Sequence, residues 1–255
     1  MYNPIRRNRN IGTAKQGHGQ NNKLCIPCPL VVSKMFYEQI ENYHKEIRII
    51  HGREFVFVVE ATLHDFEHAC SVDEVAKMLH LLPAEDLGKL GRIVFRQPKR
   101  KEAILSPVWG RLVLHYEFEN HFEPTIILEA FNINVKLKWP KSLSVESQKE
   151  LEWLRQDGHK FVTDRRSHIA SFEKSACRNT QLYRTLLHEV GHYVHYLQEV
   201  IWPLGDHAPP EKYQIFLDRY FDGIPERERE TFAHSYAERQ YAALVAKKVV
   251  PFEQK

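Results

Sequence analysis

The residues with the clearest capacity for chemistry form the segment His188-Glu189-Val190-Gly191-His192. On a helix, residues four apart lie on nearly the same face, so both imidazoles can reach one ion. Zinc accepts neutral imidazole nitrogen at about 2.0–2.1 Å and prefers four ligands in a tetrahedron. The Glu189 carboxylate lies beside this pair, where it can take a proton from a water molecule at the metal. The segment therefore predicts a zinc site suited to metal-assisted hydrolysis.

The context of the motif decides whether it is more than a chance match, because the chain contains 15 His. Residues 180–198 carry apolar side chains at helical spacing, which predicts a helix with one buried stripe: Leu182, Leu186, Val190, Tyr193, Val194 and Leu197. Gly191 costs about 1 kcal/mol relative to Ala inside a helix. Close approach of a neighbouring element would justify that cost. Both features favour a buried helix that meets a cleft.

A catalytic zinc needs a third protein ligand and an open fourth position. The extended motif that ends in a third His is absent, since His195 replaces its Gly and Gln198 replaces its His. The predicted third ligand is Glu230, because Ala233 and Ala237 give its helix a small-residue face that can pack closely against the motif. Two alternatives are Glu226 and His234. We expect His195 to line the cleft or to lie at the surface.

With these residues the chain resembles the gluzincins, metallopeptidases in which a Glu on a downstream helix completes the two-histidine motif. The stretch 230–237 is similar to the second motif of anthrax lethal-factor-type peptidases and of small bacterial regulatory metallopeptidases. The resemblance covers residues 160–245 and implies a zincin-like fold and Zn²⁺ as cofactor. It differs at His234, where thermolysin-like members have an Asp. His207 and Tyr220 are candidate donors to an oxyanion, as His or Tyr residues are in gluzincins.

The elements that must position these residues can be read from periodicity and capping. Ser71 and Glu74 match a capping box, which predicts a helix with Val75, Met78 and Leu79 inward and an end near Pro83. Other helices are expected at 31–43, 145–156 and 225–248. Strands are expected at 54–60, 92–95, 110–118 and 125–137, in a mainly antiparallel sheet. Extended or irregular chain is expected at 161–172, a charged hairpin loop at 99–101, and a loop with a short helix at 202–226.

Composition narrows the class of protein. The 255 residues are 43% hydrophobic, which is enough to bury a proper core. We expect no membrane span, no signal peptide and a cytoplasmic location. Cys25 and Cys28 are interpreted as reduced loop cysteines, and Cys70 and Cys177 as reduced core cysteines. The net charge of +3 does not indicate nucleic acid, which we expect as a partner only through the basic N-terminal arm.

These features predict an α+β, zincin-like fold with an antiparallel or mixed sheet, an active-site helix and a downstream Glu-bearing helix. The expected organisation is a flexible basic arm (1–30), a sheet-rich lobe (31–140) and a catalytic region (141–255). The expected activity is that of a zinc metallopeptidase acting on a peptide or protein, with His188, His192 and Glu230 as ligands and Glu189 as base. The alternative is a zincin-like regulatory or binding module without peptidase activity.

Overall fold

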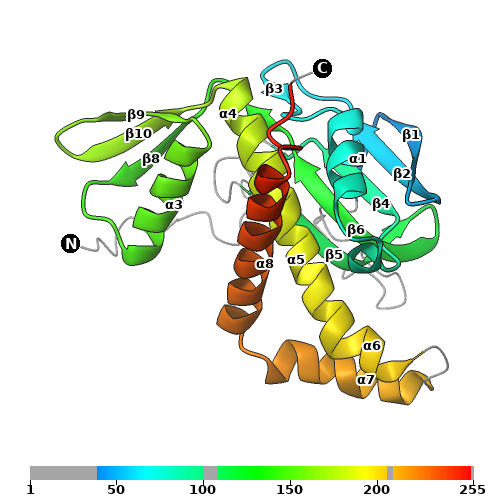
Figure 1. The fold of residues 1–255 in the computed structure, drawn as a ribbon. Coiled ribbons are helices and arrows are strands. Elements are labelled where there is room, and N and C mark those ends of the chain that lie inside the picture. Colours follow the sequence, from blue (N-terminus) through cyan, green and yellow to red (C-terminus); the bar gives the residue numbers. More distant parts are fainter. Residues whose placement is uncertain (1–38, 100–107, 206–208, 254–255) are drawn as a thin grey trace, which may run out of the picture. The chain divides into compact units, whose positions relative to one another are not determined.

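The computed structural model describes residues 39–99, 108–205 and 209–253 of the chain (Figure 1). Several predicted features lie outside the described residues. These are the arm at 1–30, most of the helix predicted at 31–43, residues 100–101 of the predicted hairpin loop, Cys25, Cys28 and His207.

A five-stranded sheet stands beside the helix that carries the motif. Its strand order is β1-β2-β4-β6-β5, so β5 is an edge strand. The strands are β1 (Tyr43–Ile50), β2 (Arg53–Glu60), β4 (Arg92–Arg96), β5 (Gly110–Phe118) and β6 (His121–Glu129). β1 pairs with β2, and β5 with β6, in antiparallel orientation, whereas β2 with β4 and β4 with β6 are parallel. The sheet is therefore mixed, which confirms the mixed alternative of the predicted α+β fold, whereas the expectation of a mainly antiparallel sheet is wrong.

The parallel pairs follow from how the chain returns between strands. Between β2 and β4 it forms α1 (Val72–Leu81) and the short helix η4 (Ala84–Leu87), and such a crossover lets the next strand run in the same direction. The capping box at the start of α1 is confirmed, because Ser71 Oγ accepts from Glu74 N and Glu74 Oε2 accepts from Ser71 N. The helix ends before Pro83, as predicted.

Two strand and helix boundaries differ from the prediction. The helix expected to reach residue 43 does not do so, because residues 39–42 are not helical and Tyr43 begins β1, where it pairs with Glu60. The single strand expected at 125–137 is divided among β6, β7 (Phe131–Asn132) and β8 (Lys136–Pro140). β7 leaves the main sheet to pair with β3 (Phe66–Glu67), so the alternating pattern continues across a change of partner.

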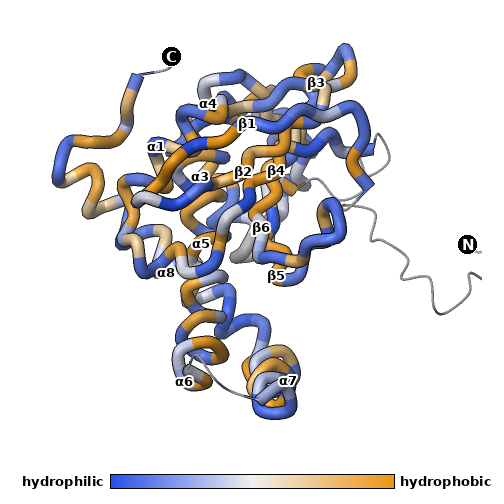
Figure 2. Tube along the Cα trace, turned by 90° about the vertical axis from the view of Figure 1, so that its right-hand side faces the viewer, coloured by the Kyte–Doolittle hydropathy of each residue, from blue (hydrophilic) through white to orange (hydrophobic). Residues whose placement is uncertain are grey.

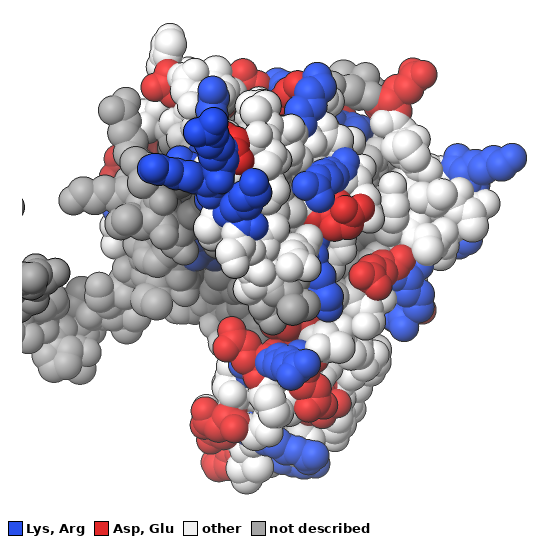
Figure 3. All heavy atoms as spheres, turned by 90° about the vertical axis from the view of Figure 1, so that its left-hand side faces the viewer, with Lys and Arg blue, Asp and Glu red and all other residues white. Residues whose placement is uncertain are grey.

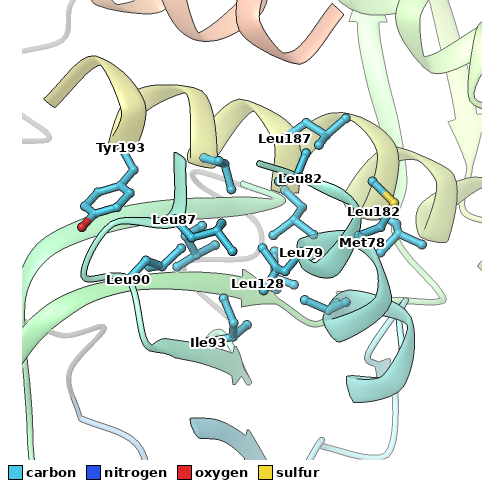
Figure 4. Close-up of a cluster of buried hydrophobic side chains, with 14 of the residues drawn as sticks. Met78, Leu79, Leu82, Leu87, Leu90, Ile93, Leu128, Leu182, Leu187 and Tyr193 are labelled. Atoms are coloured by element: carbon cyan, nitrogen blue, oxygen red, sulfur yellow. The ribbon is translucent and has the colours of Figure 1, made fainter. Parts of the chain in front are cut away.

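The main core lies between the sheet and helices α1 and α5 (Figure 1). Figure 4 shows Met78, Leu79 and Leu82 of the α1 region meeting Leu182 and Leu187 of the motif helix, with Ile93 and Leu128 on the sheet. The opposite face of the sheet buries a smaller cluster of Val58, Val94, Tyr116, Phe118 and Ile127. Figure 2 shows β2 and β4 as largely apolar, as expected for strands buried on both faces.

A second, three-stranded sheet has the order β8-β10-β9 and packs on one helix. Its other strands are β9 (Lys160–Thr163) and β10 (Ser167–Ser171), and the helix is α3 (Val145–Gln156), which has the predicted bounds. Trp139, Leu151, Leu154 and Ala170 form its core. Figure 3 views this side of the protein, where Lys and Arg side chains gather on the upper part and both charge signs mix below.

The C-terminal half is helical. The motif lies in a run of α4 (Lys174–Asn179), π-helical η5 (Thr180–Thr185), α5 (Leu186–Tyr196), π-helical η6 (Leu197–Ile201) and α6 (Trp202–Leu204). Next come α7 (Pro210–Asp218), π-helical η7 (Arg219–Gly223) and α8 (Glu226–Ala246). The segment 202–226, predicted as a loop with a short helix, is therefore mostly helical, and Pro210 lies in the first turn of α7, where proline is tolerated.

No helix among the described residues is both long enough and apolar enough to span a membrane. Cys70 and Cys177 are buried and reduced, as predicted. Burial raises the pKa of the Cys177 thiol to about 12, so this side chain behaves as a small apolar group.

Candidate metal centre

Gly191 marks a close approach between α5 and α8, which pack side by side (Figure 1). A Cβ atom added to Gly191 would lie 2.9 Å from both the Cα and the carbonyl oxygen of Ala233, and 3.2 Å from Cβ of Tyr236. Real Cβ contacts essentially never fall below 3.0 Å, so only glycine permits this packing. The predicted close approach at Gly191 and the small-residue surface at Ala233 are both confirmed.

This packing brings Glu230, which precedes Ala233 by less than one turn of α8, to the two motif histidines. Nε2 of His188 lies 3.3 Å from Oε2 of Glu230, and Nε2 of His192 lies 3.3 Å from Oε1. The two Nε2 atoms are 3.0 Å apart. Hydrogen bonds from His188 and His192 hold the pKa of the Glu230 carboxyl well below its usual range. The three predicted metal-binding residues therefore converge on one point.

The spacing of the three donors fits a zinc ion. Tetrahedral bonds of about 2.0–2.1 Å require donor atoms about 3.3 Å apart, and the observed separations are 3.0, 3.3 and 3.3 Å. Two imidazoles and one carboxylate are also a donor set that zinc accepts. Among the described His, Cys, Asp and Glu side chains, this is the one group of three whose ligand atoms all lie within 4.8 Å of one another.

Glu189 is buried beside these donors, with 8% of its surface exposed. Its Oε2 accepts a hydrogen bond of 2.7 Å from the backbone N of Leu112 on the edge strand β5. Burial raises the pKa of the Glu189 carboxyl, and the nearby His188 and His192 oppose that shift. A carboxylate with a raised pKa accepts a proton more readily, which suits a general base.

The two alternatives to Glu230 do not join the donor group. Glu226 is exposed at the first residue of α8. The ring of His234 packs against that of His188, with centroids 4.4 Å apart, and against Trp153 at 4.8 Å. Burial, with a smaller effect from His188, lowers the pKa of His234 to about 4, so its imidazole is neutral near pH 7. In the described part of the chain, buried Nδ1 of His188 has no hydrogen-bond partner.

His195 lies neither in a cleft nor at the surface, so that prediction is wrong. Its ring is buried and stacks on Phe232 with centroids 4.5 Å apart, because the outer turn of α5 is covered by α8 and η7. Tyr220, the described candidate oxyanion donor, lies 5.5 Å from the same His195 ring and is itself buried. Burial raises the pKa of the Tyr220 hydroxyl to about 12.

Two residues near the candidate metal centre were not predicted from the sequence. Leu112 contributes its backbone N–H, which every residue except proline has, so the residue type gives no signal. Trp153 reaches the site from α3, where it packs on His234. Its place in a helix of mostly polar residues gave no signal of a neighbouring site.

Comparisons of the chain with protein-family profiles, with curated proteins and with solved structures find no match. The geometry of its own residues is therefore the basis for interpreting the site.

Proposed function

We propose that the protein is a zinc-dependent peptidase with a zincin-like catalytic region of the gluzincin type. The observation that carries the proposal is the donor geometry: His188, His192 and Glu230 present ligand atoms 3.0 to 3.3 Å apart, beside the buried carboxylate of Glu189. A site that only stores a metal has no need of a buried acid next to the ligands, so Glu189 favours a hydrolase over a binding module.

The roles of the residues follow from their environments. A zinc ion bound here would supply a Lewis acid that polarises a carbonyl and lowers the pKa of water. Glu189 accepts the proton from the attacking water and returns it to the leaving amine. The N–H of Leu112 holds Oε2 of Glu189 in place, which leaves the other carboxylate oxygen for proton transfer.

The edge strand supports a peptide as the substrate. β5 lies at the end of the main sheet, next to α5, and its residues 110–114 are only partly buried. An extended peptide can add to such an edge through main-chain hydrogen bonds. The contact between Leu112 and Glu189 would keep a peptide on this strand close to the base.

Metal analysis combined with a cleavage screen tests the proposal. Purified protein should contain about one zinc per chain, because three protein ligands are present, and His188→Ala should lose it. The wild-type protein should also cleave members of a peptide library in a chelator-sensitive manner. Zinc retained by His188→Ala would contradict the metal site. Stoichiometric zinc without cleavage of any peptide would instead favour a zincin-like regulatory module.

A further inference from the structure

A cavity of about 560 Å³ opens beside the metal centre, between α3, η5 and α8. His234 forms part of its wall and also packs against His188, with ring centroids 4.4 Å apart. The cavity is therefore separated from a metal-binding residue by the thickness of one imidazole. His234 therefore contacts both the cavity and the candidate metal centre.

Most of the charge on the cavity wall is already compensated. Nη2 of Arg184 donates to Oδ1 of Asp157 at 2.6 Å and to the carbonyl oxygen of Trp153 at 2.7 Å. The second carboxylate oxygen of Asp157 accepts from the Thr180 hydroxyl at 2.7 Å. Arg184 and Asp157 therefore form a neutral pair that is bound to the surrounding protein.

Glu238 is the exception. Its side chain is exposed on α8 at the mouth of the cavity, and no ion pair or hydrogen bond engages its carboxylate within the described residues. With Arg184 and Asp157 balanced, Glu238 gives the cavity wall one net negative charge.

The rest of the wall is rich in aromatic rings. Tyr183 and Tyr241 have ring centroids 5.9 Å apart, and Trp153 lies across the cavity on α3. The faces of such rings attract cations, and the rings also pack against the aliphatic stem of a long side chain. The wall already holds one such contact, since the Arg184 guanidinium lies 5.2 Å from the Trp153 ring centroid.

We propose that this cavity binds a lysine or arginine side chain of the peptide substrate, with the cation near Glu238 and the stem against Tyr241 and Trp153. The proposal rests on the peptidase function proposed above, because it assigns a substrate preference to that peptidase. An acidic side chain would be repelled by the carboxylate of Glu238. An apolar side chain would gain nothing from Glu238. The charge of the wall therefore selects a cation.

A binding measurement tests the cavity without using catalysis or zinc. Nα-acetyl-arginine amide is titrated into the full-length protein, and Nα-acetyl-citrulline amide serves as the neutral probe of the same shape. The indole N–H signal of Trp153 in an NMR spectrum, assigned by its loss in Trp153→Phe, reports binding. The arginine probe should shift this signal, and the citrulline probe should bind more weakly, by up to about fivefold, since an exposed ion pair contributes up to about 1 kcal/mol.

Variants of Glu238 test the source of the preference. Glu238→Gln should reduce the affinity for the arginine probe to that of citrulline, whereas Glu226→Gln, the same charge change on an exposed residue of α8, should not. Because both side chains are exposed, both variants should fold as the wild-type protein does. Equal binding of the two probes by the wild-type protein, or unchanged affinity in Glu238→Gln, would overturn the proposal.

A cleavage profile separates this proposal from the function on which it builds. The wild-type protein should prefer peptides with Lys or Arg at one position near the cleaved bond, and Glu238→Lys should shift that preference to Asp or Glu. If no peptide is cleaved but the arginine probe still binds through Glu238, the peptidase function fails and the cation-binding cavity stands. If cleavage occurs without a basic preference and the probe does not bind, the cavity assignment fails alone.

Discussion

Two glutamates next to the same histidines have opposite environments. Glu189 is buried, and its burial raises the pKa of the carboxyl. The Glu230 side chain is 45% exposed, and hydrogen bonds from His188 and His192 lower its pKa. Environments that push two carboxyl pKa values apart give them different roles. Glu189 is thereby suited to accept a proton, and Glu230 to remain ionised as a ligand.

The position of Glu230 leads to a prediction about metal affinity. Glu230→Ala should weaken zinc binding by more than about a hundredfold, because loss of even an outer-shell partner costs about 10–100-fold. Glu226→Ala, which removes an exposed carboxylate from the first turn of the same helix, should leave the affinity unchanged. Competition with a chromogenic chelator measures both constants. The reverse order of the two variants would assign the third ligand to Glu226.

At the scale of elements, the sequence predicted those whose signals are local. The Ser71 capping box is present, and the strand at 110–118 and the helix at 145–156 have the expected bounds. Capping residues and the periodicity of apolar residues lie within the segment that they predict. The strand predicted at 125–137 failed because alternation does not reveal which partner a strand has. Here β6 ends at Glu129, and Phe131 and Asn132 pair with β3 instead. Likewise, Pro210 starts α7 where a loop was expected.

The packing of α5 on α8 can be tested at Gly191. Gly191→Ala gains about 1 kcal/mol in helix propensity, but its methyl group would clash with the Ala233 backbone at 2.9 Å. Since overpacking costs about 1–3 kcal/mol, we expect the free energy of unfolding to stay the same or to fall. We also expect weaker zinc binding, because α8 must move and carry Glu230 with it.

Gly223→Ala is the matched control, because a Cβ at Gly223 would meet only Cγ of Arg219, at 3.5 Å. Chemical denaturation and zinc titration of the two variants give the comparison. If Gly191→Ala bound zinc as tightly as the wild-type protein, the close approach would not be what positions Glu230.

At the scale of the whole molecule, long-range contacts join the segments that frame the site. Nε of Arg178 donates to Oε1 of Glu74 at 2.6 Å, and both side chains are buried. Nη2 of Arg178 also donates to the carbonyl oxygen of Phe252 at 3.1 Å. This contact links α1, α4 and the C-terminal segment. Such contacts, like the one between Leu112 and Glu189, arise only when distant segments meet, so sequence patterns could not reveal them.

Removal of one partner from this buried pair should be strongly destabilising. Arg178→Met leaves Glu74 buried without its cation, which should lower the free energy of unfolding by about 3–5 kcal/mol. Adding Glu74→Gln to that variant should recover part of the loss, because no unpaired charge remains. Urea denaturation of the single and double variants measures the coupling. Strictly additive losses would mean that the two side chains do not interact.

Glu189→Gln tests most directly the proposed role of Glu189 as the base of a metal-dependent peptidase. The glutamine carbonyl can still accept the hydrogen bond from Leu112, so fold and zinc content should be preserved while the proton acceptor is lost. Peptide cleavage by the wild-type protein and the variant is compared at equal zinc occupancy. We predict that the variant is slower by at least about a hundredfold. Equal cleavage by the two proteins, or none by the wild type, would contradict the assignment.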